Sequence, residues 1–156
     1  MYAKVYGETT CGINGEQIIV EVDISNGLPS FDIVGLPDTS VKESRERVRA
    51  ALKNSCLIFP MTRITVNLAP ADLKKDGSGL DLPIAVGILV SSGVLQQEQV
   101  DDTIFVGELA LDGTIRQIAG VLPMILHARD IGRKNIVIPS GNCAEGRLVD
   151  GIDVLI

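Results

Sequence analysis

The sequence predicts one α+β domain in which a mixed sheet packs with helices. Residues 18–24 alternate apolar and polar side chains with the period of two that is typical of a half-buried strand. Residues 80–94 are apolar on nearly every side, as a buried helix is. The 156 residues contain no linker, internal repeat or low-complexity tract, so we expect these strands and helices to share a single domain.

The first part of the chain is expected to form an antiparallel β meander. Residues 3–6 and 18–24 are its first two predicted strands. Asn26-Gly27 is a turn sequence that favours positive φ, and residues 31–34 are expected to return as the third strand.

A helix over residues 40–54 is expected to follow the meander. The break at residues 35–38 leaves Asp38 or Thr39 as a good N-cap. The apolar side chains of its expected inner face are Val41, Val48 and Leu52.

The rest of the chain is predicted to alternate strands with helices. Asp112-Gly113 is a strong hairpin signal, and Gly132 is suited to end a helix over residues 121–131. The predicted strands cover residues 63–68, 104–111, 115–118, 136–138 and 153–156. Because the last strand runs to the final residue, we expect the chain to be part of a longer protein.

Composition and charge argue against several classes of protein. The net charge of −6 gives no overall attraction to nucleic acid, and 3% aromatic residues without Trp make a base-stacking surface poor. Residues 1–10 lack the apolar core that a signal peptide needs, and the best apolar run, which Pro83 interrupts, is shorter than the ~20 residues that a membrane span needs. Three separated cysteines without a C-x-x-C pair fit a reducing compartment, so we expect a cytoplasmic protein with no membrane partner. A single histidine, His127, makes a zinc site a poor interpretation.

The loop "KKDGSGLDLP" allows several interpretations. Ser78 could be a nucleophile with Lys74 or Lys75 as its base, but lysines on a solvated loop stay protonated. A Walker A phosphate loop is excluded, because the chain has no Gly-Lys dipeptide. An anion nest at residues 77–79 remains open. The favoured interpretation is a polar loop in which Ser78 or Asp81 caps the next helix.

A stripe of basic residues follows one side of the first predicted helix. Such a stripe can follow a phosphate backbone, but Glu43 and Glu46 are interleaved and could neutralise it as an ordinary solvated face. With the two lysines of the polar loop, the candidate DNA-binding residues are Lys42, Arg45, Arg49, Lys53, Lys74 and Lys75.

Three stretches, "FDIVGLPDTSVKESRERVRAALKNS", "RITVNLAPADLKKDGSGLDLPIAVGIL" and "VGELALDGTIRQIAGVLPMI", carry a family resemblance over nearly the whole chain. They resemble the N-terminal domain of the magnesium-chelatase-like AAA+ ATPases of the YifB and ComM family. The resemblance implies the ribosomal protein S5 domain 2-like fold of the Lon protease C-terminal domain. It also implies an ATPase module beyond this domain that would use ATP and Mg²⁺, so no cofactor is expected here.

The resemblance also bears on the hypothesis that the chain is a Lon-type peptidase. Laid on the Lon pattern, "GLDLPIA" puts Asp81 at the position of the nucleophilic serine, and "IAGVL" puts Leu122 at the position of the lysine. A carboxylate with a leucine cannot generate an alkoxide, so no catalytic residue is expected.

The function that the resemblance implies is support of hexamer assembly and DNA binding, for ATP-driven branch migration in natural transformation. The alternatives are a Lon-type Ser-Lys peptidase with Ser78 as nucleophile, and a chelatase-type subunit for metal insertion. The expected partners are further copies of the chain in a ring, and DNA. Of these two roles, assembly is slightly favoured because a domain of charge −6 needs a focused basic patch to hold DNA.

Overall fold

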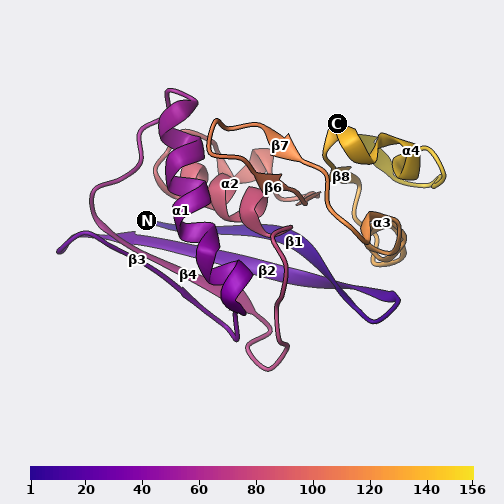
Figure 1. Ribbon diagram of the computed structural model, residues 1–156, viewed down its shortest axis with the longest axis horizontal. Coiled ribbons are helices and arrows are strands. Elements are labelled where there is room, and N and C mark those ends of the chain that lie inside the picture. The colour runs from indigo at the N-terminus through magenta and orange to yellow at the C-terminus, as the bar shows by residue number, and fades with distance from the viewer.

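All 156 residues, Met1–Ile156, are described by a computed structural model. A mixed seven-stranded sheet, in the order β3-β4-β2-β1-β5-β8-β9, packs with four α-helices (Figure 1). The sheet strands are β1 (Tyr2–Cys11), β2 (Asn14–Ser25), β3 (Ser30–Val34), β4 (Arg63–Ala69), β5 (Thr103–Phe105), β8 (Asn135–Val137) and β9 (Asp153–Leu155). A separate two-stranded sheet is formed by β6 (Glu108–Leu109) and β7 (Ile115–Arg116). The helices are α1 (Thr39–Asn54), α2 (Asp81–Ser91), α3 (Val121–Asp130) and α4 (Cys143–Gly146), with two 3₁₀ turns, η1 (Gln97–Gln99) and η2 (Ser140–Asn142).

The first two strands are longer than their apolar patterns predicted. β1 and β2 pair from Tyr2 opposite Asp23 to Cys11 opposite Asn14, with Gly12 in the turn at a φ of 64°. Their distal halves carry polar side chains such as Glu16 and Gln17, which the apolar alternation does not include. Backbone hydrogen bonding therefore extends the β1–β2 hairpin beyond the segment that the apolar alternation predicts.

The predicted meander is wrong in its third strand. β3 does not pair with β2; it lies at the edge of the sheet, parallel to β4, with Phe31 opposite Ile64. β4 pairs antiparallel with β2 along all seven of its residues. Because β4 takes the place beside β2, the chain between β3 and β4, which includes α1, makes the crossover that a parallel pair requires.

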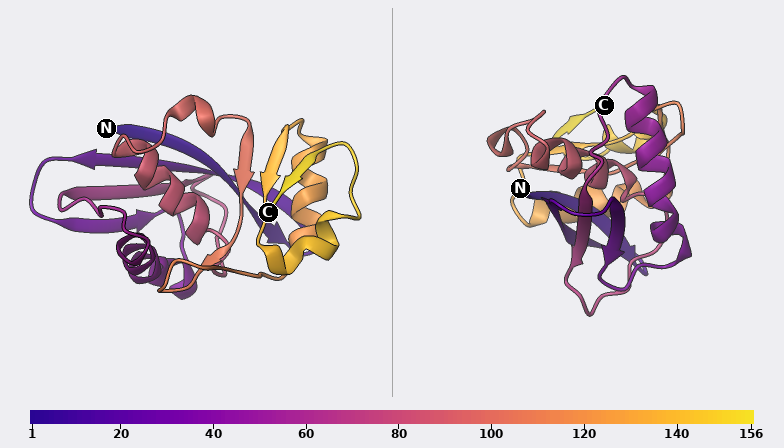
Figure 2. Two further views of the ribbon diagram at one scale, coloured as in Figure 1. Left: turned by 90° about the horizontal axis from the view of Figure 1, so that it is seen from above. Right: turned by 90° about the vertical axis from the view of Figure 1, so that its left-hand side faces the viewer.

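Three hydrophobic clusters hold the layers together. In the largest, Val20 and Ile64 of the sheet pack with Val48 of α1 and Ile84 of α2. A second cluster joins α3 to β5 and β8, and a third joins β1 to α2. The C-terminal elements, coloured orange to yellow, gather at one end of the molecule (Figure 2).

Local signals mark most helix and turn boundaries correctly. Asp38 is the N-cap of α1, as predicted, and accepts a hydrogen bond of 2.8 Å from the Val41 N–H. Gly132 follows α3 with a φ of 84°. The predicted strand over 104–111 is instead two short strands, because β5 pairs with β8 in the large sheet whereas β6 pairs with β7 in the small one. No helix has the length and apolarity needed to cross a membrane.

Candidate functional site

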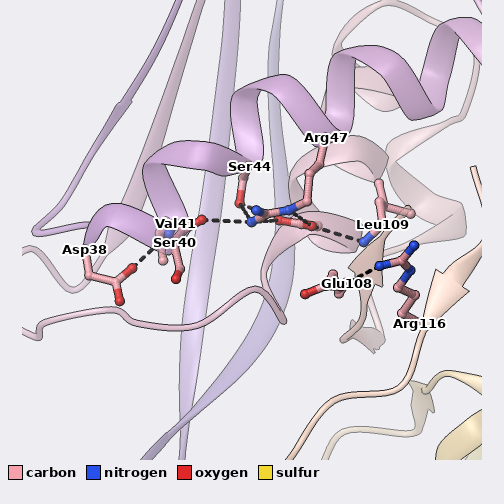
Figure 3. Close-up of polar contacts among 9 residues, drawn as sticks. Asp38, Ser40, Val41, Ser44, Arg47, Glu108, Leu109 and Arg116 are labelled. Carbon is pink, nitrogen blue, oxygen red and sulfur yellow. Dashed lines mark hydrogen bonds and ion pairs between the residues drawn. The ribbon is translucent and has the colours of Figure 1, made fainter. Parts of the chain in front are cut away.

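Asp81, at the position expected for the Lon serine, lies at the centre of a buried polar cluster. Its carboxylate accepts hydrogen bonds from the Ser44 hydroxyl, from Arg47 at 2.6 and 3.1 Å, and from the Leu109 N–H at 3.0 Å. Figure 3 shows the side chains of Ser44 and Arg47 extending from the same side of α1. The prediction that Ser78 or Asp81 caps α2 is wrong, because the N-cap is Leu80 without a side-chain bond.

The polar cluster holds three elements together. Asp81 is fully buried, and both of its oxygens have donors from α1 or β6. Arg47 also donates to the Ser40 carbonyl at 2.8 Å (Figure 3), and the bond to Asp81 raises the pKa of its guanidinium. A carboxylate with all these donors is an acceptor that fixes α2 against α1.

The other Lon-dyad position, Leu122, is also occupied by a packing residue. Leu122 is half-buried and packs against the cluster under α3. Its backbone N–H donates to Glu145 at 3.1 Å, which ties the first turn of α3 to α4. An aliphatic side chain provides no base.

The segments before α2 and α3 border a common hollow of about 320 Å³. Ser78 lines it together with Glu8 of β1 and Gln117, and no lysine or histidine is among the lining residues. Lys74 is exposed on the loop. The structure therefore brings Ser78 together with polar and acidic groups, and not with the base that a Ser-Lys mechanism needs.

Lys75 is a correction to the predicted DNA-binding set. The sequence suggests a solvated lysine, but its side chain is fully buried and its ammonium donates to the Pro70 carbonyl. Backbone hydrogen bonds to Leu36 and Asp38 draw this part of the loop against the chain that enters α1. Burial lowers the pKa of Lys75. A buried ammonium in this position is not accessible to a phosphate group.

The remaining α1 candidates form an accessible basic face. Lys42, Arg45 and Lys53 are exposed and Arg49 is half-buried. None of them takes part in the five ion pairs of the structure, so no direct ion pair joins them to Glu43 or Glu46.

A buried Glu8–His127 pair was not foreseen from the sequence. Glu8 of β1 is 1% exposed and lies 3.0 Å from Nδ1 of His127 on α3. Burial raises the pKa of Glu8 from its ordinary 4.5 to about 7, although the bond to His127 opposes the change. The two residues are far apart in the chain and meet only when α3 packs on the β1–β2 hairpin, so no local pattern could announce them. No group of three or more His, Cys, Asp or Glu side chains is placed to hold a metal ion.

Comparison with known proteins identifies the family of this chain, in which Asp81 and Leu122 stand at the positions of the Lon serine and lysine. Residues 20–142 match the family described as Subunit ChlI of Mg-chelatase, and the chain belongs to that family.

Longer relatives carry the same domain. The chain is 46% identical over 147 residues to Competence protein ComM of Haemophilus influenzae and 45% identical over 152 residues to Uncharacterized protein YifB of Escherichia coli. These matches cover 94% and 97% of the chain but only 29% and 30% of the relatives, whose N-terminal regions correspond to it. Lon protease 2 of Bacillus subtilis is 31% identical over 88 residues, which is 55% of the chain and 15% of that protein. The chain thus spans about 30% of the length of its ComM and YifB relatives.

Proposed function

We propose that this chain is a non-catalytic N-terminal domain of a magnesium-chelatase-like AAA+ ATPase, and that it supports hexamer assembly and DNA contact. The motor, with its ATP and Mg²⁺, would lie in the part of the longer protein outside this chain. The motor would act in the cytoplasm, where it would drive branch migration of DNA during natural transformation. The proposed topology is the ribosomal protein S5 domain 2-like fold.

The observation that carries the non-catalytic role is the Asp81 cluster. Where the Lon pattern has its nucleophile, this domain has a buried acceptor ion-paired to Arg47 at 2.6 Å. Where the pattern has its lysine, the half-buried Leu122 packs against a hydrophobic cluster. The nearby Ser78 borders a hollow that no lysine or histidine lines. These three placements support a domain kept for binding.

The DNA contact is supported by the basic face of α1. Its cations are spaced three to four residues apart, so they follow one side of the helix. Since they lack carboxylate partners, a polyanion would not have to displace an ion pair. Lys74, exposed on the loop before α2, is retained as a further candidate. Lys75 is withdrawn because it is buried.

The test is to titrate labelled single-stranded and branched DNA with the domain at two salt concentrations, by fluorescence anisotropy. Light scattering on the same samples reports the mass. We expect affinity to fall steeply with salt, because counterions are released when cations meet phosphates. Absence of binding at low salt would remove the DNA contact, and a ring-sized mass in that case would leave assembly as the domain's role.

A further inference from the structure

One end of the basic face leads into a hollow that the Asp81 cluster does not use. This hollow, of about 170 Å³, lies between the C-terminal half of α1 and the loop that leads to β4. Arg49 and Lys53 line it from α1, and Phe59, Met61 and Thr62 line it from the loop. We call it the Arg49 hollow.

Two buried polar atoms at this hollow lack partners. Nε of Arg49 and the Thr62 hydroxyl oxygen are the buried side-chain nitrogen and oxygen atoms of the chain without a hydrogen bond. Buried polar groups are nearly always paired in folded proteins, and leaving one unpaired costs about 1–3 kcal/mol. Both residues line the same hollow, so hydrogen-bonding capacity that the fold leaves unused is concentrated at this site.

The charges at the hollow indicate an anion. The Arg49 guanidinium lies 5.4 Å from the centroid of the Phe59 ring, so an aromatic face, rather than a carboxylate, holds it in place. Lys53 is exposed and forms no ion pair. A guanidinium, an ammonium and a hydroxyl at one concave site are donors suited to the oxygens of a phosphate.

We propose that the Arg49 hollow seats one phosphate group of a nucleic-acid strand that runs along the basic face of α1. The inference rests on the proposed DNA contact and assigns it a fixed anchor. A second hollow, lined by Asp32, Ile33, Lys42 and Arg45, lies near the other end of the helix. The midpoints of the two cation pairs are 7 to 8 residues apart, or about 11 Å along α1 at 1.5 Å per residue.

A polyanion fits this arrangement better than a single carboxylate of a protein partner does. The cations continue from one hollow to the next, so a chain of phosphates can meet each in turn. An isolated acidic side chain would occupy the Arg49 hollow alone and leave Lys42 and Arg45 without a ligand. Met61, which is 71% exposed at the rim, offers an apolar surface to a sugar or a base.

The experiment compares oligo(dT) binding by the wild type with binding by Arg49→Gln and by Thr62→Val, over a range of salt. Arg49→Gln should weaken binding about tenfold at low salt and reduce the magnitude of the log–log salt slope by about 0.7, the value for one single-strand phosphate. Thr62→Val should weaken binding about fivefold with little change of the salt slope. It should not lower the unfolding midpoint, because it removes an unpaired hydroxyl. Arg129→Gln, at an exposed arginine of α3, is the matched control and should bind as the wild type does.

The possible failures are distinguishable. No binding of oligo(dT) by the wild type would overturn the proposed DNA contact together with the anchor. Wild-type affinity in Arg49→Gln and Thr62→Val, combined with loss of binding in Lys42→Gln, would overturn the anchor alone. A third outcome is that an acidic peptide binds tightly and displaces oligo(dT) from the wild type but not from Arg49→Gln. The hollow would then be a protein-binding site, and the proposal would fail.

Discussion

The two sides of α1 differ in whether their charged side chains have ion-pair partners. On the side toward α2, Arg47 is paired with Asp81, and each group has further hydrogen bonds. On the outer side, Lys42, Arg49 and Lys53 have no carboxylate partner. One helix therefore carries a satisfied cluster that fixes the fold and a row of cations available to an external anion.

The largest expected effect is on the satisfied side. Arg47→Met leaves the Asp81 carboxylate buried without its cation, and breaking such a pair costs about 3–5 kcal/mol of unfolding free energy. Chemical denaturation of the two proteins measures the loss. Arg129→Met is the matched control, because it breaks an exposed pair with Asp130 and should change stability by less than about 1 kcal/mol. Equal losses in both variants would contradict the structural role of the cluster.

Glu8 sharpens the comparison, because it is as buried as Asp81 but has only His127 as a side-chain partner. Its folded pKa of about 7 is above its ordinary 4.5, so the folded state binds the proton more tightly. The contribution of Glu8 to stability is therefore complete below about pH 4.5 and is lost as pH rises through about 7. The loss should reach up to about 3 kcal/mol.

Unfolding free energies of the wild type and Glu8→Gln between pH 5 and pH 8 measure this contribution. The difference between the two proteins should change with pH in favour of the variant as pH rises, because Gln cannot ionise. Glu16 and Arg133 also act on the pKa of Glu8 through their charges. A difference that stays constant with pH would show that Glu8 titrates normally.

The smallest effect on stability is expected on the outer side of α1. Lys42→Ala together with Arg49→Ala removes two cations that have no carboxylate partner, so the unfolding free energy should change by about 1 kcal/mol or less. DNA affinity should fall to a similar extent for all sequences. A large loss of stability without loss of affinity would reverse the roles assigned to the two sides.

The parts of the fold that depend on local signals could be predicted from the sequence. The Asp38 cap, the Asp112-Gly113 turn and the apolar face of α1 are short-range features, and each is present. The pairing of β3 with β4 could not be predicted, because no local sequence feature determines which of these two strands pairs with β2. The antiparallel match of β4 to β2 decides that order.

The site was less accessible to sequence reasoning for the same reason. The sequence could show that Asp81 and Leu122 replace the Lon dyad, but not that Asp81 pairs with Ser44 and Arg47, which lie more than thirty residues away. The exposure of Lys75 was mistaken because its loop pairs with the entrance to α1. A residue type indicates the available chemistry, whereas burial and partners come from long-range packing.

The most direct test of the central claim is the salt dependence of DNA affinity for the wild type and for Lys42→Ala with Arg49→Ala. If the outer side of α1 holds phosphates, the double variant should show weaker binding and a log–log salt slope that is smaller in magnitude by about two counterions. An unchanged slope and affinity in a folded double variant would contradict the claim and place any DNA contact elsewhere on the molecule.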